Sequence, residues 1–103
     1  MQPKVSIILI TYNRARFLAR ALNSALQQTY DNLEIYIMDD ASTDNTEAVV
    51  QPYLKDERIK YVKNNPNVGF SHNVQKGLMQ CIAGEFFLVL SDDDKLIDGV
   101  MLK

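Results

Sequence analysis

The chain has 103 residues, of which 47% are hydrophobic and 23% charged, and its formal net charge is −2. This length and composition predict one compact domain, spanning residues 1–103, with a hydrophobic core of its own. The small negative charge and the lack of a basic block argue against nucleic-acid binding through phosphate neutralisation. The single cysteine, Cys81, cannot form an internal disulfide, and the apolar runs are too short to cross a bilayer. We therefore expect a cytoplasmic chain, with membrane association left open for a longer form of the protein.

The first half of the chain is predicted to alternate strand, helix, strand and helix. Residues 4–11 form an aliphatic run without strict alternation, which is typical of a strand covered on both faces. Apolar side chains recur at helical spacing through residues 15–28, which predicts an amphipathic helix. Residues 33–40 predict a second strand. Residues 42–54 begin with capping residues and continue as a second helix, which Pro52 weakens in its later turn.

The second half repeats this alternation. Residues 58–64 form a shorter and more polar strand, which makes it a candidate edge of the sheet. After a turn at "NPNVG", residues 70–81 predict a third helix. Residues 85–91 predict a fourth strand, and residues 95–103 the beginning of a further helix. This order indicates an α/β, doubly wound domain with a mostly parallel sheet and helices on both faces.

Polar residues follow every predicted strand at its carboxyl end, where ligands of such sheets bind. In chain order they are Thr11, Tyr12 and Asn13; Asp39 and Asp40; Asn64 and Asn65; and Ser91, Asp92, Asp93 and Asp94. Five carboxylates on one rim are more than an ordinary loop face requires. We therefore predict a functional site at this rim, with a solvated acidic loop as the alternative.

The three consecutive aspartates suit a divalent cation. Carboxylate oxygens are the ligands that Mg²⁺ and Mn²⁺ prefer, together with the phosphates of a substrate. Zinc is disfavoured because His72 stands alone, and the sequence contains neither common glycine-rich phosphate loop. In an extended segment Asp92 and Asp94 point one way and Asp93 the other, so this pattern alone leaves the choice of ligand open.

Two residues at the rim have the chemistry of a nucleoside pocket. The ring of Tyr12 can lie against a flat base, and Asp40 can accept a hydrogen bond from a base imide N–H. The alternative is structural: Tyr12 packs over the first helix, and Asp39 or Ser42 caps the second helix.

Four segments in this order, "VSIILITYNR", "EIYIMDDASTDNT", "NNPNVGFSHNVQKGL" and "GEFFLVLSDDD", closely resemble the N-terminal part of family 2 glycosyltransferases. The resemblance covers nearly the whole chain and implies the GT-A fold. It implies that a nucleotide-diphosphate sugar, with a UDP-sugar favoured, binds over the strand ends, where Mn or Mg bridges its diphosphate to the aspartates. It also implies inverting transfer of the sugar to an acceptor hydroxyl of a saccharide, lipid or protein.

The resemblance assigns roles to particular residues. Nucleotide binding falls to Thr11, Tyr12, Asn13, Asp40 and Asp92, and metal binding to Asp93, with Asp94 as a second candidate. The chain departs from the family pattern at Ser91, where many relatives carry an aspartate, and at Val74, where many carry an arginine. Relatives continue beyond this region into acceptor-binding elements and the general base. We therefore expect a donor-binding fragment whose catalytic residues are unknown and which can self-associate through apolar surface that the missing part would cover.

Two other classes of protein compete with this interpretation. A signalling receiver domain also has a doubly wound sheet and an acidic Mg²⁺ site. Its paired acids follow the first strand, however, where this chain has Thr11, Tyr12 and Asn13, and its phosphoacceptor aspartate follows the third, where this chain has Asn64 and Asn65. The other alternative is a non-catalytic module that retains a nucleotide pocket.

Overall fold

The computed structural model describes residues 4–27, 32–80 and 86–91. In these ranges the strands are β1 (Val5–Thr11), β2 (Leu33–Asp39), β3 (Ile59–Lys63) and β4 (Phe86–Ser91). The helices are α1 (Ala15–Leu26), α2 (Thr46–Val50), the 3-10 helix η1 (Gln51–Lys55) and α3 (Phe70–Gln80). Each strand and helix predicted within these ranges is confirmed, with ends that shift by a few residues. Cys81 and the helix predicted at 95–103 lie outside the described residues.

The second predicted helix is shorter than expected and changes type along its length. The α-helical part ends at Val50, and the chain continues as η1, in which Pro52 occupies one of the first two positions. Proline has no backbone N–H to donate to the carbonyl four residues earlier, so an α-helix cannot continue through it with all its hydrogen bonds intact. A tighter 3-10 turn therefore replaces the last α-helical turn.

The strands are parallel and lie in the order β3-β2-β1-β4. β3 is at one edge of this sheet, which confirms the prediction made from its short, polar sequence. The order also overturns the receiver-domain alternative. In receiver domains the first strand lies between the second and the third, whereas here β2 lies between β1 and β3, as in the dinucleotide-binding order.

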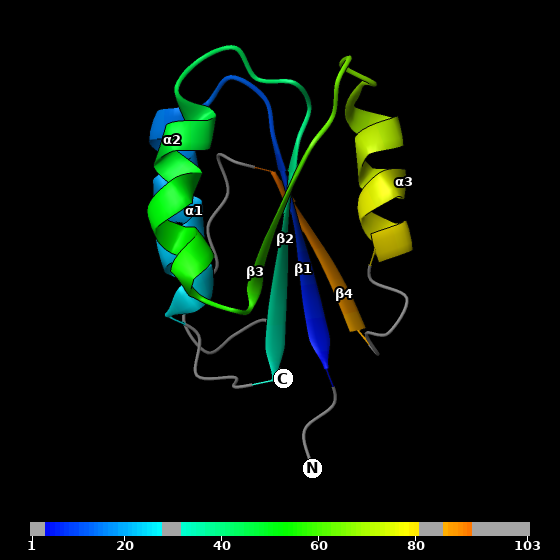
Figure 1. Ribbon diagram of the computed structural model, residues 1–103. Helices are drawn as coiled ribbons and strands as arrows, with labels where there is room; N and C mark the ends of the chain where they lie inside the picture. Colours follow the sequence, from blue (N-terminus) through cyan, green and yellow to red (C-terminus); the bar gives the residue numbers. More distant parts are fainter. Residues whose placement is uncertain (1–3, 28–31, 81–85, 92–103) are drawn as a thin grey trace.

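Helices cover both faces of the sheet: α1 and α2 lie on one side, and α3 lies on the other (Figure 1). β1 supplies side chains to both cores. Ile7 and Leu9 belong to the cluster that includes residues of α1, whereas Ile8 and Ile10 belong to the cluster against which Val74 of α3 packs. This two-sided burial explains why aliphatic residues occupy consecutive positions from Ile7 to Ile10 without alternation.

The third helix approaches the sheet closely at one glycine. A Cβ atom placed on Gly77 would lie 2.5 Å from Cγ2 of Ile8 and 3.2 Å from Cγ of Met38. Any larger residue would push α3 away from the centre of the sheet. Among the described residues no helix is both long enough and apolar enough to span a bilayer.

Candidate functional site

The carboxyl ends of the strands lie side by side, as the sequence predicts. Thr11 of β1 is in register with Asp39 of β2, which is in register with Lys63 of β3. Ser91, the last residue of β4, pairs with Ile10. The predicted metal ligands Asp93 and Asp94 lie outside the described residues, and so does Asp92, which is predicted to bind the nucleotide.

Asp40 is buried at this rim and binds the segment that leads into α3. Its carboxylate accepts hydrogen bonds from the backbone N–H groups of Val68 and Gly69, both at 2.8 Å, and from Nδ2 of Asn64 at 3.0 Å. Burial opposes ionisation, but these hydrogen bonds, helped by the charge of Lys76, outweigh it and hold the pKa of Asp40 below its ordinary value. Asp40 is therefore a firmly ionised carboxylate.

Two asparagines extend this hydrogen-bond network into the core. Nδ2 of Asn64 also donates to Oδ1 of Asn73, and Nδ2 of Asn73 donates to the carbonyl of Met38, both at 2.9 Å. Both asparagines are buried. Sequence reasoning placed Asn64 at the rim but missed Asn73. The available signal was its position four residues before Gly77, on the same face of the helix, which is the face that α3 turns to the sheet.

The side chain of Asp39 points into the protein and makes structural hydrogen bonds rather than facing solvent at the rim. It is fully buried, and its two carboxylate oxygens accept hydrogen bonds from the backbone N–H of Ser42 at 3.0 Å and from the hydroxyl of Tyr61 at 2.5 Å. Burial and this bond to a carboxylate raise the pKa of Tyr61 well above its ordinary value. The alternative that Asp39 or Ser42 caps the second helix does not hold, because the side chain that accepts from the backbone N–H of Thr46 is that of Asp44.

Asn13 ties the loop after β1 to the loop after β2. Its backbone N–H donates to Oγ of Ser42 at 2.9 Å, and its Oδ1 accepts from the backbone N–H groups of Thr43 at 2.7 Å and Asp44 at 3.3 Å. Its φ of 52° is in the left-handed region, which asparagine tolerates better than most residues. The side chain of Asn13 is thus directed to the neighbouring loop.

A pocket of about 260 Å³ opens on the α3 side of the rim. Its lining residues are Ile10, Tyr12, Asp40, Asn67, Gly69, Phe70 and Asn73. The pocket brings together Tyr12 and Asp40, the pair with nucleoside-binding chemistry. Tyr12 and Phe70 expose 49% and 61% of their surface, so two aromatic rings stand at the pocket with Asp40 buried beside them. This arrangement suits a flat, partly polar ring.

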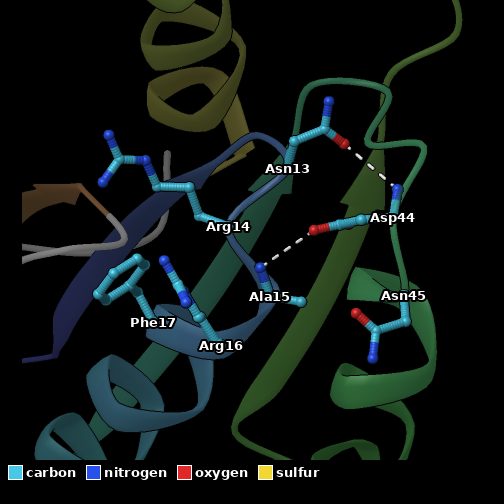
Figure 2. A pocket seen from close by; sticks show the side chains of 7 residues that line it. All are labelled: Asn13, Arg14, Ala15, Arg16, Phe17, Asp44 and Asn45. Atoms are coloured by element: carbon cyan, nitrogen blue, oxygen red, sulfur yellow. Dashed lines mark hydrogen bonds between the residues drawn. The ribbon is translucent and has the colours of Figure 1, made fainter.

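The other two predicted nucleotide residues of the first loop lie elsewhere. Thr11 is buried, and Asn13 lines a second pocket of about 560 Å³ at the start of α1 (Figure 2). Within the described ranges no three His, Cys, Asp or Glu side chains gather into a group able to hold a metal ion. The prediction of a metal site therefore rests on Asp93 and Asp94.

The fold and the rim define an α/β class of domain that has the strand order of dinucleotide-binding sheets and a pocket beyond the strand ends. The family model described as glycosyl transferase family 2 matches residues 6–103. The chain belongs to this family.

Relatives and solved structures agree with this assignment. The chain is 44% identical over 101 residues to GalNAc(5)-diNAcBac-PP-undecaprenol beta-1,3-glucosyltransferase of Campylobacter jejuni, covering 96% of this chain and 32% of that protein. S. aureus TarS 1-349 in complex with UDP-GlcNAc is 32% identical with a TM-score of 0.83, over 89% of this chain and 27% of the TarS 1-349 chain. The mannosyltransferase PcManGT from Pyrobaculum calidifontis, in complex with GDP-Man and Mn²⁺, is 28% identical with a TM-score of 0.82, over 90% of this chain and 28% of that chain. The chain thus spans about a third of the length of these proteins and has the GT-A glycosyltransferase fold.

Proposed function

We propose that this chain binds a nucleotide-diphosphate sugar in the pocket between Tyr12 and Phe70, and that the protein transfers the sugar to an acceptor hydroxyl. The single observation that carries the proposal is this pocket, because it places an exposed aromatic ring beside the ionised carboxylate of Asp40 at the carboxyl ends of the strands. Family membership supports it, as do the structural neighbours in complex with UDP-GlcNAc and with GDP-Man.

The residues of this chain have distinct roles in the proposal. Tyr12 stacks against the base, and Asp40 orients the base through a hydrogen bond while holding the backbone of Val68 and Gly69 in place. Asp93, with Asp94 as the second candidate, supplies the hard carboxylate oxygens that fit Mn²⁺ or Mg²⁺. A divalent ion at such a site neutralises the charge that develops on the departing nucleoside diphosphate. The general base that activates the acceptor is not assigned to any residue of this chain.

The donor and the acceptor are proposed as chemical classes. A UDP-sugar is favoured because Asp40 suits the imide N–H of uracil, and TarS, at 32% identity, is solved with UDP-GlcNAc. Among saccharide, lipid and protein acceptors, a lipid-linked saccharide is favoured because the Campylobacter relative is named for GalNAc(5)-diNAcBac-PP-undecaprenol. Self-association stays a prediction, which Leu78, Met79 and Val89 support because they are at least 40% exposed.

Titration calorimetry with UDP, with and without Mn²⁺, tests the proposal. We expect UDP binding that Mn²⁺ strengthens, and Tyr12→Ala should weaken binding about tenfold in either condition because stacking on one aromatic ring contributes roughly 1–3 kcal/mol. Asp93→Ala should remove the effect of Mn²⁺ and leave the metal-free affinity intact. Glu57→Gln is the matched control and should bind UDP as the parent chain does. Glu57 is an exposed acid that precedes β3, so it lies at the amino end of that strand and away from the carboxyl ends where the pocket is. Binding that is indifferent both to Mn²⁺ and to the Tyr12 substitution would contradict the proposal.

A further inference from the structure

The first turns of α1 gather three arginines around one aromatic ring. The Cζ atoms of Arg14, Arg16 and Arg20 lie 5.6, 5.0 and 5.8 Å from the centroid of the Phe17 ring. All three distances are within the range of a cation–π contact. The arginines are exposed and Phe17 is half-buried, so a single ring holds three guanidinium groups on one patch of surface. We call Arg14, Arg16, Phe17 and Arg20 the arginine patch.

The electrostatics of the arginine patch favour an anion. The three guanidinium groups lie at separations comparable with or smaller than the Debye length of about 10 Å at 0.1 M salt, so they repel one another. The sequence of α1 contains neither aspartate nor glutamate, and the amino end of a helix adds further positive potential. Within the described part of the chain, the guanidinium of Arg16 contacts the Phe17 ring but forms neither a hydrogen bond nor an ion pair.

The arginine patch borders the pocket of about 560 Å³ (Figure 2). Arg14, Arg16 and Phe17 line it together with Asn13, Ala15, Asp44 and Asn45. The carboxylate of Asp44 is turned to the backbone, because it accepts from the N–H of Ala15 at 3.2 Å and from the N–H of Thr46 at 3.0 Å. Burial opposes ionisation of Asp44, but its hydrogen bonds outweigh that effect and keep its pKa below the ordinary value. These hydrogen bonds of its carboxylate thus go to the amino ends of α1 and α2.

We propose that the arginine patch binds a phosphate-bearing ligand at a site separate from the nucleotide pocket. The planar guanidinium fork matches two oxygens of a phosphate group, and two neighbouring forks can bind one phosphate or a diphosphate. The Tyr12 pocket includes residues of α3, whereas Arg16, Phe17 and Arg20 of the arginine patch belong to α1 on the other face of the sheet, with Arg14 as the N-cap residue of α1 (Figure 1). The two pockets share no lining residue, so both sites can be filled at once. The phosphate comes either from a soluble anion or from the headgroup of an anionic lipid, against which the half-buried Phe17 ring can also pack.

Two binding assays on the same set of variants test this site and identify the source of the phosphate. Calorimetry with inorganic pyrophosphate, in EDTA to remove metal-dependent binding, reports on a soluble anion. Co-sedimentation with vesicles of phosphatidylglycerol, compared with phosphatidylcholine, reports on a lipid headgroup. Arg14→Gln/Arg16→Gln removes two charges from the patch. Lys55→Gln/Lys60→Gln removes two exposed charges elsewhere and is the matched control.

We expect the parent chain to bind in at least one of the two assays. In that assay the affinity should fall about tenfold or more in the arginine variant and less than about twofold in the lysine control. The reason is that each charge-assisted contact to phosphate is among the stronger hydrogen bonds. Arg14→Lys/Arg16→Lys should bind at an intermediate level, since it keeps the charge and loses the fork. Absence of binding in both assays, or an equal loss in the lysine control, would overturn the proposal. UDP binding in the presence of Mn²⁺ should be the same in the arginine variant, so failure at this site is distinguishable from failure of the proposed nucleotide site.

Discussion

Replacement of Asp40 by asparagine tests how the rim of the sheet is stabilised. Asparagine has almost the same shape, but only one of its two terminal atoms accepts hydrogen bonds. The oxygen of the asparagine amide can accept either from Val68 N–H and Asn64 Nδ2 together or from Gly69 N–H alone. In either orientation at least one donor at this rim faces the NH₂ group instead of an acceptor. An unsatisfied buried donor costs roughly 1–3 kcal/mol, and the remaining bonds lose their ionic character. We expect Asp40→Asn to lower the free energy of unfolding by about 3 kcal/mol at pH 7.

The pH dependence gives this prediction a second, independent readout. Because the pKa of Asp40 is lower in the folded chain than the ordinary aspartate value of 3.8, ionisation of Asp40 stabilises the fold above pH 3.8. This contribution is lost as the pH falls through the folded pKa, which lies below 3.8. The difference in unfolding free energy between the parent chain and Asp40→Asn should therefore be constant near neutral pH and become smaller below pH 3.8.

Urea unfolding monitored by circular dichroism at several pH values measures both effects. Asp56→Asn is a matched control, because Asp56 also accepts three hydrogen bonds, all from Arg58, but on a partly exposed loop. We expect the control to lose less than about 1 kcal/mol, as is usual for exposed ion pairs. A loss in Asp40→Asn no larger than in the control, or a difference that persists unchanged at low pH, would refute the assignment of Asp40 as the buried anchor of this rim.

Two further substitutions test the packing of α3 and the loop after β1. Gly77→Ala should destabilise the fold by about 1–2 kcal/mol in the same urea assay, because the new methyl group would lie 2.5 Å from Ile8 and the strain exceeds the gain in helix propensity. Gln75→Ala, on the exposed side of α3, is the control and should be neutral. Equal effects of the two substitutions would contradict the close approach of α3 to the sheet. Asn13→Ala should cost about 2 kcal/mol through a lost acceptor and a left-handed φ of 52°, whereas Asn13→Gly should cost about 1 kcal/mol less. Equal losses for alanine and glycine would show that the backbone conformation contributes nothing.

Local patterns were sufficient to predict most of the fold. The mostly aliphatic sequence of β1, the periodicity of α1 and the polar character of β3 each follow from physical rules that act over a few residues. The ends of elements follow less directly from such rules, because a single residue can change where an element stops. Pro52 was expected to weaken a helix, but the sequence did not indicate that the chain would continue through it as a 3-10 turn.

The candidate site was predictable in place but not in detail. That Tyr12 and Asp40 lie together follows from the parallel sheet, because both come just after a strand. Two details of the site were not predictable: Asp39 turns inward to Tyr61, and Asn13 binds the loop after β2. Both depend on contacts between residues 22 to 31 positions apart, which no local pattern encodes. The arginine patch could be predicted only as polar helix positions, since the convergence on Phe17 depends on side-chain packing.

The side-chain anchors at the carboxyl edge have a consequence for how this domain tolerates changes in chain length. Asn13 fixes one loop against the next, and Asp40 fixes the segment at 68–69 against the end of β2. An added or deleted residue in any of these connections would displace its neighbours as well. At the opposite edge, the connection at 56–58 is short, and the Asp56 side chain accepts three hydrogen bonds from Arg58 within the same connection. Natural or engineered length variation should therefore be accepted more readily there than beside the pocket lined by Tyr12 and Phe70.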